Sequence, residues 1–195
     1  MKFVIATHNQ HKCEEFQRIL APLGIETVMC DLPEVEETGE TLAENAFIKA
    51  QSAFEATGLA SVADDSGLMV DALDGAPGVF SSRYAGEGAS YDDVINKLLY
   101  EMRDVPDGKR TAYFESAICC ILPNGEKLEV SGKCFGTIAF ERSGNGGFGY
   151  DPVFLVGDKS FADMSGEEKD EISHRGIALR EFAKLLSEKL TKGEI

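Results

Sequence analysis

Residues 2–24 read KFVIATHNQHKCEEFQRILAPLG, and the hydrophobic pattern of this stretch changes once along its length. The segment KFVIAT is short and rich in apolar and β-branched residues, which is typical of a strand. Beyond Lys12, apolar side chains recur at the spacing of one helix face: Phe16, Ile19, Leu20 and Leu23. Gly24 then supplies a helix stop. The stretch therefore predicts a strand, a polar loop and a helix, which together open an α/β protein.

The rest of the sequence contains signals for further helices and for two short strands. Three residue pairs have the capping-box pattern that begins a helix: Thr41 with Glu44, Ser90 with Asp93, and Ser165 with Glu168. Apolar spacing predicts a last amphipathic helix from about residue 174 to residue 191. Residues 25–30 and 153–156 are short and apolar, and we predict a strand in each.

Three longer β-rich segments occupy the middle of the chain. Residues 111–123 and 127–140 flank Asn124-Gly125, a strong turn signal, and predict a long hairpin. Residues 60–73 begin and end as a strand, but we expect the run Asp64-Asp65-Ser66-Gly67 to interrupt it. Helices that alternate with strands at both ends of the chain predict one α/β domain.

Composition excludes several classes of partner. The 195-residue chain carries 34 acidic and 19 basic side chains, a formal charge of 19 − 34 = −15. Such a charge repels nucleic acid polymers and anionic membranes, so we expect neither as a partner. No stretch approaches the ~20 apolar residues of a membrane span, and the first apolar run is too short for a secretory signal. We therefore expect a cytoplasmic protein whose five cysteines, without a CxxC pair, are packed free thiols.

The first candidate site is the polar loop at the start of the first helix, Thr7-His8-Asn9-Gln10-His11-Lys12. A helix N-terminus offers unpaired backbone N–H groups and a partial positive charge, which suit a phosphate group. Lys12 adds a full charge, and the side chains before it add hydrogen-bond donors. Because the glycines of a Walker motif are absent, an ordinary polar loop is the alternative interpretation.

The second candidate site is the carboxylate pair Asp64-Asp65 inside an otherwise buried strand. Buried carboxylates cost free energy unless they are paired or bind a metal ion. Their oxygens suit Mg²⁺, which typically takes one or two carboxylates together with water and substrate phosphates. The acidic loop with Glu34, Glu36 and Glu37 could add a ligand. A tight turn for the aspartates and a solvated surface for the glutamates are the alternatives.

Two further candidate segments lie in the second half of the chain. The glycine-rich segment 144–152 matches G-x-G-x-x-G, but Asp-Pro follows the glycines instead of a helix, so we reject a dinucleotide fingerprint. Its aromatics Phe148 and Tyr150 instead suggest a stacking surface for a flat ligand, with core anchoring as the alternative. Ser173-His174-Arg175, with Lys169 upstream, offers donors to carbonyls and phosphates, or else serves as surface and capping groups.

Five motifs, in this order along the chain, resemble those of the inosine triphosphate pyrophosphatase family, also called XTP/dITP diphosphatases: Ala6–Lys12, Ala63–Leu68, Gly75–Tyr84, Gly147–Pro152 and Ser173–Leu179. The resemblance covers nearly the whole chain. It implies a single nucleoside triphosphate pyrophosphatase domain over residues 1–195. The implied fold is an elongated mixed sheet with flanking helices, in two lobes around a central cleft. A homodimer is also implied, with Cys119, Cys120 and Ile121 of the apolar hairpin as a surface for it.

The resemblance also implies an activity and a set of site residues. The activity is Mg²⁺-dependent hydrolysis of ITP, dITP and XTP to the monophosphate and pyrophosphate, with Mn²⁺ as a substitute metal. Asp65 would be the catalytic carboxylate and, with Glu36 and Glu37, a metal ligand; Asp64 is an alternative ligand. The implied substrate-binding residues are Thr7, His8, Asn9, Gln10, His11, Lys12, Ser66, Phe148, Gly149, Tyr150, Asp151, Lys169, His174 and Arg175. His8 departs from the glycine that the family often has there.

Three rival functions stay open at this point. A Maf-type nucleotide pyrophosphatase with another base preference is disfavoured by the segments Phe148–Pro152 and Ser173–Arg175. A non-catalytic nucleotide-binding module would show no turnover. A phosphatase acting at the γ position would release orthophosphate instead of pyrophosphate.

Overall fold

The computed structural model describes residues 2–193, which divide into two compact units. The first unit combines the residues up to Asp65 with Ser116–Gly132 and the residues from His174 onward. The second unit comprises Ser66–Glu115 and Lys133–Ser173. The chain therefore crosses between the units several times, each time within a strand or just before a helix.

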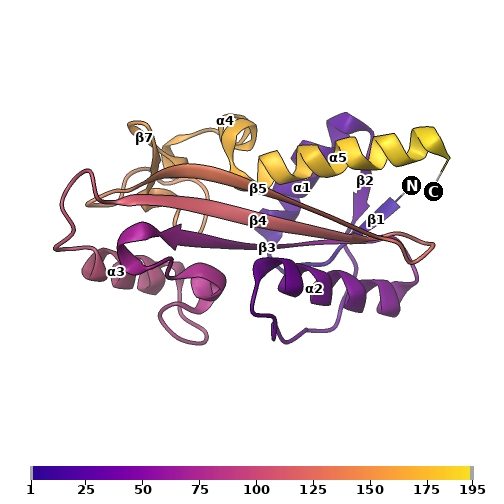
Figure 1. Cartoon of the computed structure of the whole chain (residues 1–195), viewed down its shortest axis with the longest axis horizontal. Coiled ribbons are helices and arrows are strands. Elements are labelled where there is room, and N and C mark those ends of the chain that lie inside the picture. Colours follow the sequence, from indigo (N-terminus) through magenta and orange to yellow (C-terminus); the bar gives the residue numbers. More distant parts are fainter. Residues whose placement is uncertain (1, 194–195) are drawn as a thin grey trace. The chain divides into compact units, whose positions relative to one another are not determined.

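One seven-stranded sheet has the order β2-β1-β3-β4-β5-β6-β7 (Figure 1). β1 pairs in parallel with β2 and with β3, whereas β6 pairs antiparallel with both β5 and β7, so the sheet is mixed. The strands are β1 Lys2–Ile5, β2 Glu26–Val28, β3 Ser61–Val70, β4 Thr111–Ile121, β5 Lys127–Ile138, β6 Phe154–Val156 and β7 Lys159–Ser160. The helices are α1 Gln10–Leu20, α2 Leu42–Thr57, α3 Tyr91–Glu101, α4 Gly166–Ile172 and α5 His174–Lys192. The predicted α/β class, a mixed sheet with flanking helices, is confirmed.

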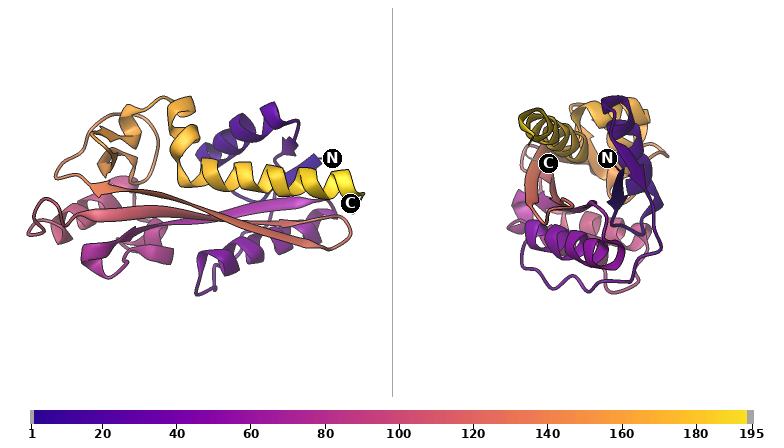
Figure 2. Two further views of the ribbon diagram at one scale, coloured as in Figure 1. Left: turned by 45° about the horizontal axis from the view of Figure 1, so that its top comes forward. Right: turned by 90° about the vertical axis from the view of Figure 1, so that its right-hand side faces the viewer.

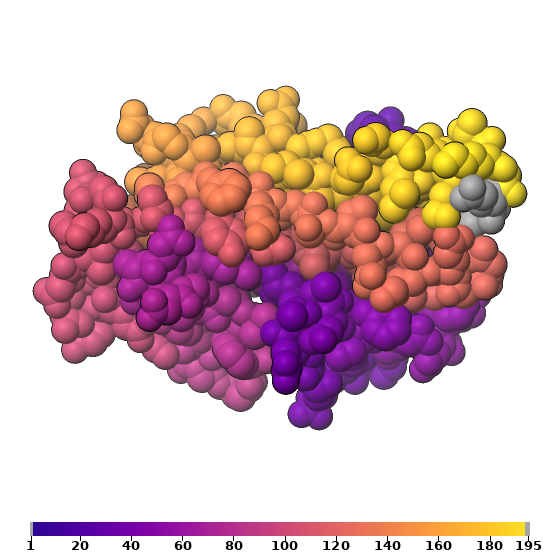
Figure 3. Space-filling view, viewed as in Figure 1, coloured from indigo at the N-terminus to yellow at the C-terminus, as the bar shows by residue number. Residues whose placement is uncertain are grey.

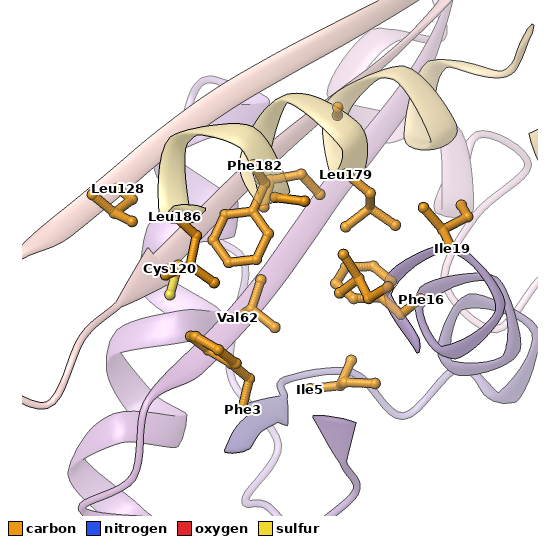
Figure 4. Close-up of a cluster of buried hydrophobic side chains, with 14 of the residues drawn as sticks. Phe3, Ile5, Phe16, Ile19, Val62, Cys120, Leu128, Leu179, Phe182 and Leu186 are labelled. Carbon is orange, nitrogen blue, oxygen red and sulfur yellow. The ribbon is translucent and has the colours of Figure 1, made fainter. Parts of the chain in front are cut away.

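In the first unit, α1 and α5 lie on one side of the strands and α2 lies on the other (Figures 1 and 2). The core under α1 and α5 is formed by apolar side chains from helices and strands: Phe3, Ile5, Phe16, Ile19, Val62, Cys120, Leu128, Leu179, Phe182 and Leu186 (Figure 4). The rings of Phe3 and Phe182 meet edge to face with centroids 5.9 Å apart, a favoured aromatic geometry. The predicted face of the first helix packs at Phe16, Ile19 and Leu20, but its fourth predicted residue, Leu23, lies beyond the end of α1 and is exposed.

A glycine sets how closely α5 approaches the sheet. A Cβ atom on Gly132 of β5 would lie 2.4 Å from the carbonyl oxygen of His174, so this contact requires glycine. Farther along, α5 lies beside the tip of the β4–β5 hairpin (Figure 3), where Lys189 pairs with Glu126. The Gly132 contact sets the N-terminal turn of α5 against β5, and the ion pair holds the C-terminal part of α5 against the hairpin turn.

The second unit has an aromatic core. The ring centroid of Phe154 lies 4.7 Å from that of Phe114 and 4.9 Å from that of Phe161. The buried guanidinium of Arg110 donates hydrogen bonds of 2.6–2.9 Å to four backbone carbonyls, those of Met102, Val105, Ile138 and Ala139. This guanidinium satisfies backbone groups where α3 and β5 end.

Local signals in the sequence were reliable. All three predicted capping boxes form, at the starts of α2, α3 and α4. Asn124-Gly125 turns the hairpin, and Gly125 has a φ of +82°. The predicted interruption at Asp64–Gly67 is wrong, because β3 runs unbroken from Ser61 to Val70. The strand continues because each aspartate finds cationic partners, and because Gly67 allows the carbonyl of Gly78 to lie against the backbone.

Two predictions about surfaces need correction. Cys119, Cys120 and Ile121, predicted as a dimer surface, are all buried within this single chain. The prediction that all five cysteines are packed free thiols holds for four of them, which are buried. It is wrong for Cys30, which is exposed. Of the helices in residues 2–193, none combines the length and the apolar character needed to cross a bilayer.

Cys30 is expected to react alone with a small thiol reagent when the protein is native. The other four thiols are buried, and burial raises the pKa of Cys119 to about 12 and that of Cys134 to about 11, so they carry almost no thiolate at neutral pH. Mass spectrometry should show one adduct on the native protein, none on Cys30→Ser, and five after denaturation of the wild type. Rapid labelling of native Cys30→Ser would contradict this packing.

Candidate active site

The loop between β1 and α1 is organised by Asn9. The Oδ1 atom of Asn9 accepts hydrogen bonds from the backbone N–H groups of His11 (3.0 Å) and Lys12 (3.3 Å). Its own N–H donates to Oγ1 of Thr7 at 3.1 Å. His8, Gln10 and His11 are exposed, whereas the other three residues of the segment are half-buried. The capped turn places Lys12 at the start of α1, with its ammonium 3.0 Å from Oδ1 of Asp64.

Asp64 is the centre of a buried ion cluster in the first unit. Its Oδ2 accepts from Nε (3.0 Å) and Nη2 (2.9 Å) of Arg175, and the same guanidinium donates to Glu15. Burial alone would raise the pKa of Asp64, but Arg175, Lys12 and Lys49 hold it well below its usual range. Asp64 is therefore a permanent anion paired within the protein, which makes it a poor acceptor for a proton.

Asp65 faces a different set of partners. Its Oδ1 accepts from Nζ of Lys49 at 2.8 Å, and its Oδ2 accepts from Nδ2 of Asn45 at 3.3 Å. Burial raises the pKa of Asp65, although Lys49 and Lys12 act against this shift. Two neighbouring carboxyl groups thus have pKa values moved in opposite directions. Asp65 is the one whose pKa is moved toward neutral pH, as proton transfer requires.

Lys49 joins Asp65 to the acidic loop. Its ammonium lies 3.0 Å from Oε1 of Glu37 and 2.8 Å from Oδ1 of Asp65. Burial alone would lower the pKa of Lys49, but the carboxylates of Asp65, Asp64 and Glu37 raise it above its usual value. Glu36, predicted alongside Glu37, is exposed. The structure therefore brings Glu37 and Asp65 onto one cationic group.

Sequence reasoning missed Lys49 and Asn45. Both lie on α2, four residues apart, on the face that also carries the buried residues Ala46 and Ala50. A lysine and an asparagine among small inward-facing residues of an amphipathic helix are a signal, because buried polar groups require partners. The partners of these two could not be named before the fold was known.

The carboxylates present fit a divalent cation of the Mg²⁺ type. Two oxygens, one from Glu37 and one from Asp65, converge on the Lys49 ammonium, so this position already suits positive charge. Within residues 2–193, no group of three or more His, Cys, Asp or Glu side chains encloses a metal position. A pair of carboxylates is nevertheless the usual protein share for Mg²⁺, which completes its shell with water and phosphate oxygens.

The second unit holds another predicted group, on the glycine-rich segment and α4. Oδ2 of Asp151 accepts from Nζ of Lys169 at 2.6 Å and from the backbone N–H of Phe148 at 2.9 Å. The Lys169 ammonium also lies 4.8 Å from the centroid of the Phe148 ring. A Cβ on Gly147 would meet Oδ2 of Asp151 at 1.9 Å, so only glycine fits there. Asp151 therefore ties the loop to Lys169.

The remaining predicted residues differ in exposure. Tyr150 is buried and donates to the carbonyl of Ser81 at 2.8 Å, as core anchoring predicts, whereas the Phe148 ring is half-buried and contacts Tyr91. Gly149 has a φ of +61°, and Ser66 is half-buried on β3. His174 is buried at the start of α5, next to Arg175.

The fold and these residues define a class of protein. It is an α/β protein in which a capped helix N-terminus, two differently tuned aspartates and two lysines meet in one compact unit, a combination suited to the phosphates of a nucleotide.

Comparison with known proteins agrees with this class. The sequence matches the model of the Ham1 family over residues 3–185. It is 47% identical over 187 residues to a dITP/XTP pyrophosphatase of Lactiplantibacillus plantarum, covering 92% of this chain and 91% of that protein. A HAM1 protein from Coxiella burnetii has a solved structure with a TM-score of 0.86 and 42% identity, over 96% of this chain and 99% of that one. The chain belongs to the Ham1 family, and the resemblance read from the motifs is confirmed.

Proposed function

We propose that this protein hydrolyses deaminated purine nucleoside triphosphates, namely ITP, dITP and XTP, to the monophosphate and pyrophosphate. It would thereby keep these nucleotides out of nucleic acid synthesis. The observation that carries the proposal is Asp65, held by Lys49 beside Glu37, in a chain 47% identical to a dITP/XTP pyrophosphatase over nearly its whole length. The substrate-binding residues implied by the motifs are kept in this proposal, except that Arg175 is assigned an indirect role, because Asp64 and Glu15 hold its guanidinium.

In the proposed mechanism, water attacks the α-phosphorus and pyrophosphate leaves. Asp65 orients the water and accepts its proton, a role for which burial has raised its pKa. The ammonium groups of Lys49 and Lys12 stabilise the negative charge that develops on the phosphates. Asp64 stays charged and holds Lys12 at 3.0 Å. The two adjacent aspartates therefore have different partners because one accepts a proton and the other stays charged to hold Lys12.

Glu37 and Asp65 are the residues that would hold the divalent cation, Mg²⁺ with Mn²⁺ as a substitute. When bound, such an ion neutralises charge on phosphate oxygens. Glu36 is exposed, and Asp64 is paired with Lys12 and Arg175, which favours Glu37 as the partner of Asp65. Lys49 keeps the two carboxylates together through its contacts to both.

Selection of the purine base is assigned to the aromatic ring of Phe148 and to the hydrogen-bond donors Lys169 and His174. Phe148 supplies an aromatic surface, and Lys169 is fixed beside it by Asp151. Hypoxanthine and xanthine carry an oxygen at C6, where adenine carries an amino group. A donor from His174 would pair with that oxygen and would face adenine donor to donor. The guanidinium of Arg175 is held by Asp64 and Glu15, so we assign its effect on the substrate to anchoring the start of α5.

His174→Ala is expected to reduce the preference for ITP over ATP by at least about tenfold, because a lost hydrogen bond to the substrate removes part of a discrimination that can reach ~10⁴–10⁵. The ratio of the two kcat/KM values measures it. Lys184→Ala, which removes an exposed side chain of the same helix, is the matched control and should keep the ratio. An unchanged ratio in His174→Ala would remove this residue from base recognition.

Product analysis tests the function as a whole. Turnover of ITP, XTP, dITP, ATP and GTP with Mg²⁺ should yield pyrophosphate, and the three deaminated substrates should be preferred. Orthophosphate as the product would indicate a γ-phosphatase, a preference for other bases would indicate a Maf-type activity, and no turnover would indicate a binding module. Any of these results would replace the proposal.

The whole chain is proposed to act as one domain, since β3, β4 and β5 each contribute residues to both units. A homodimer in the cytoplasm completes the proposal. Its interface must lie elsewhere than the buried residues Cys119, Cys120 and Ile121. Sedimentation of the purified protein tests the dimer directly.

A further inference from the structure

The structure assigns a positioning role to Asn45: its single buried amide holds the acidic loop and Asp65 at a fixed separation, and this separation creates the divalent-cation site. The inference rests on the proposed function for its relevance to turnover. The amide clamp, meaning Asn45 with the backbone of Gly39 and the carboxylate of Asp65, lies entirely in the first unit.

The clamp uses both ends of one side chain. Oδ1 of Asn45 accepts from the N–H of Gly39 at 2.8 Å, and Nδ2 donates to Oδ2 of Asp65 at 3.3 Å. The partners dictate this orientation, because a backbone N–H requires an acceptor and a carboxylate requires a donor. Asn45 is fully buried, so neither group can exchange its partner for bulk water. An uncharged amide carries its acceptor and its donor on two separate atoms and so meets both demands at once, whereas an aliphatic side chain of similar size meets neither.

Gly39 shows that the loop is seated tightly. A Cβ on Gly39 would lie 2.7 Å from Oδ1 of Asn45, 2.7 Å from Cβ of Glu44 and 3.0 Å from the backbone nitrogen of Asn45. Two of these atoms belong to the first turn of α2 and cannot rotate away. Any side chain at position 39 must therefore push the loop off α2, even though Asn45 itself is unchanged.

Glu37 depends on this seating. It lies two residues before Gly39, and its Oε1 reaches the Lys49 ammonium that also contacts Asp65. Lys49 follows Asn45 by four residues, so one face of α2 carries the clamp and the bridging lysine. Asn45 thus contacts Asp65 directly, and it acts on Glu37 indirectly, by holding the backbone of the acidic loop at Gly39. We infer that it sets the distance between the two carboxylates that would share a cation, without touching the substrate.

The test compares the two ends of the clamp. Asn45→Ala removes the amide, whereas Gly39→Ala displaces the loop and leaves the amide in place. Each is expected to weaken binding of Mn²⁺ alone by at least about tenfold, the change that ~1.4 kcal/mol of lost positioning produces. Titration followed by the electron paramagnetic resonance signal of free Mn²⁺ measures this without turnover. Amide hydrogen exchange in residues 36–41 should accelerate in both variants.

The double variant supplies a readout that a merely structural role would not give. If both residues act through one clamp, Asn45→Ala with Gly39→Ala should weaken Mn²⁺ binding no more than the stronger single variant. Kinetics should show a raised Mg²⁺ requirement with kcat recovered at high Mg²⁺ and the KM for ITP within about threefold of wild type. Gln51→Ala, which removes an exposed hydrogen bond to Glu55 on the same helix, should match wild type in every measurement.

The outcomes separate the clamp from the proposed function. If the folded variants bind Mn²⁺ like wild type, if their effects are additive, or if wild type itself fails to bind Mn²⁺, the clamp is overturned. If wild type binds Mn²⁺ and the variants lose it, but no nucleoside triphosphate is turned over, the clamp stands and the proposed function fails. Circular dichroism melting identifies a variant that has failed to fold, and the other variant then decides.

Discussion

Asp65→Asn is expected to lower kcat for ITP by ~10²–10⁴-fold, the contribution of a positioned general base, while the protein stays folded. The amide has the shape of the carboxyl group and keeps one oxygen as an acceptor for Lys49, while its NH2 group faces the amide of Asn45, and it cannot accept a proton from water. Lys49 keeps its ion pair with Glu37 in this variant, so we expect the fold to persist. Steady-state kinetics with release of pyrophosphate as the signal, and thermal melting of the same samples, measure the two effects.

The control is Asp158→Asn, which changes an exposed carboxyl in the turn between β6 and β7. It should keep wild-type kcat. Near-normal turnover by Asp65→Asn would remove Asp65 from the catalytic role and point to another base.

Arg175→Met is expected to cause the largest loss of stability among these variants, about 3–5 kcal/mol in the free energy of unfolding. The guanidinium pairs with Asp64 and Glu15, whose side chains are 0% and 7% exposed. Methionine fills similar space but removes the cation that the two buried carboxylates share, while Lys12 stays paired with Asp64. Urea unfolding at pH 7 measures the difference. Arg180→Met on the exposed side of the same helix is the control and should change stability little.

The pH dependence of this difference has a defined sign. In the wild type, the partners of Asp64 hold its pKa below the usual value of 3.8, so the charged form is more stable in the folded state. This contribution is complete above pH 3.8 and is lost as the pH falls through the lower folded-state pKa. In Arg175→Met, the charged form of Asp64 contributes less to the free energy of unfolding, so less stability is lost on acidification. The gap in unfolding free energy should therefore shrink below pH 3.8, and a gap that widens on acidification would contradict the assignment.

Structural features that are set by residues close together in sequence could be predicted. A capping box such as Thr41 with Glu44 is a contact within one helical turn, and an Asn-Gly turn depends on the backbone freedom of one residue. Apolar spacing predicted which faces of α1 and α5 form the core. The error at Asp64–Gly67 had the opposite origin, because local propensity disfavours charged residues in a strand and the partners that keep them there are remote.

The site follows the same division. The sequence alone determined that the chain is an α/β protein with a polar loop before its first helix, an aspartate pair, a glycine-rich aromatic segment and a basic group before its last helix. The role of each aspartate depends on contacts that form only in the folded chain. Asp64 meets Arg175 across 111 residues of sequence, and Asp65 meets Asn45 across 20. Partners at such separations in sequence are brought together by the packing of α2 and α5 around β3. This packing lowers the pKa of Asp64 and raises the pKa of Asp65.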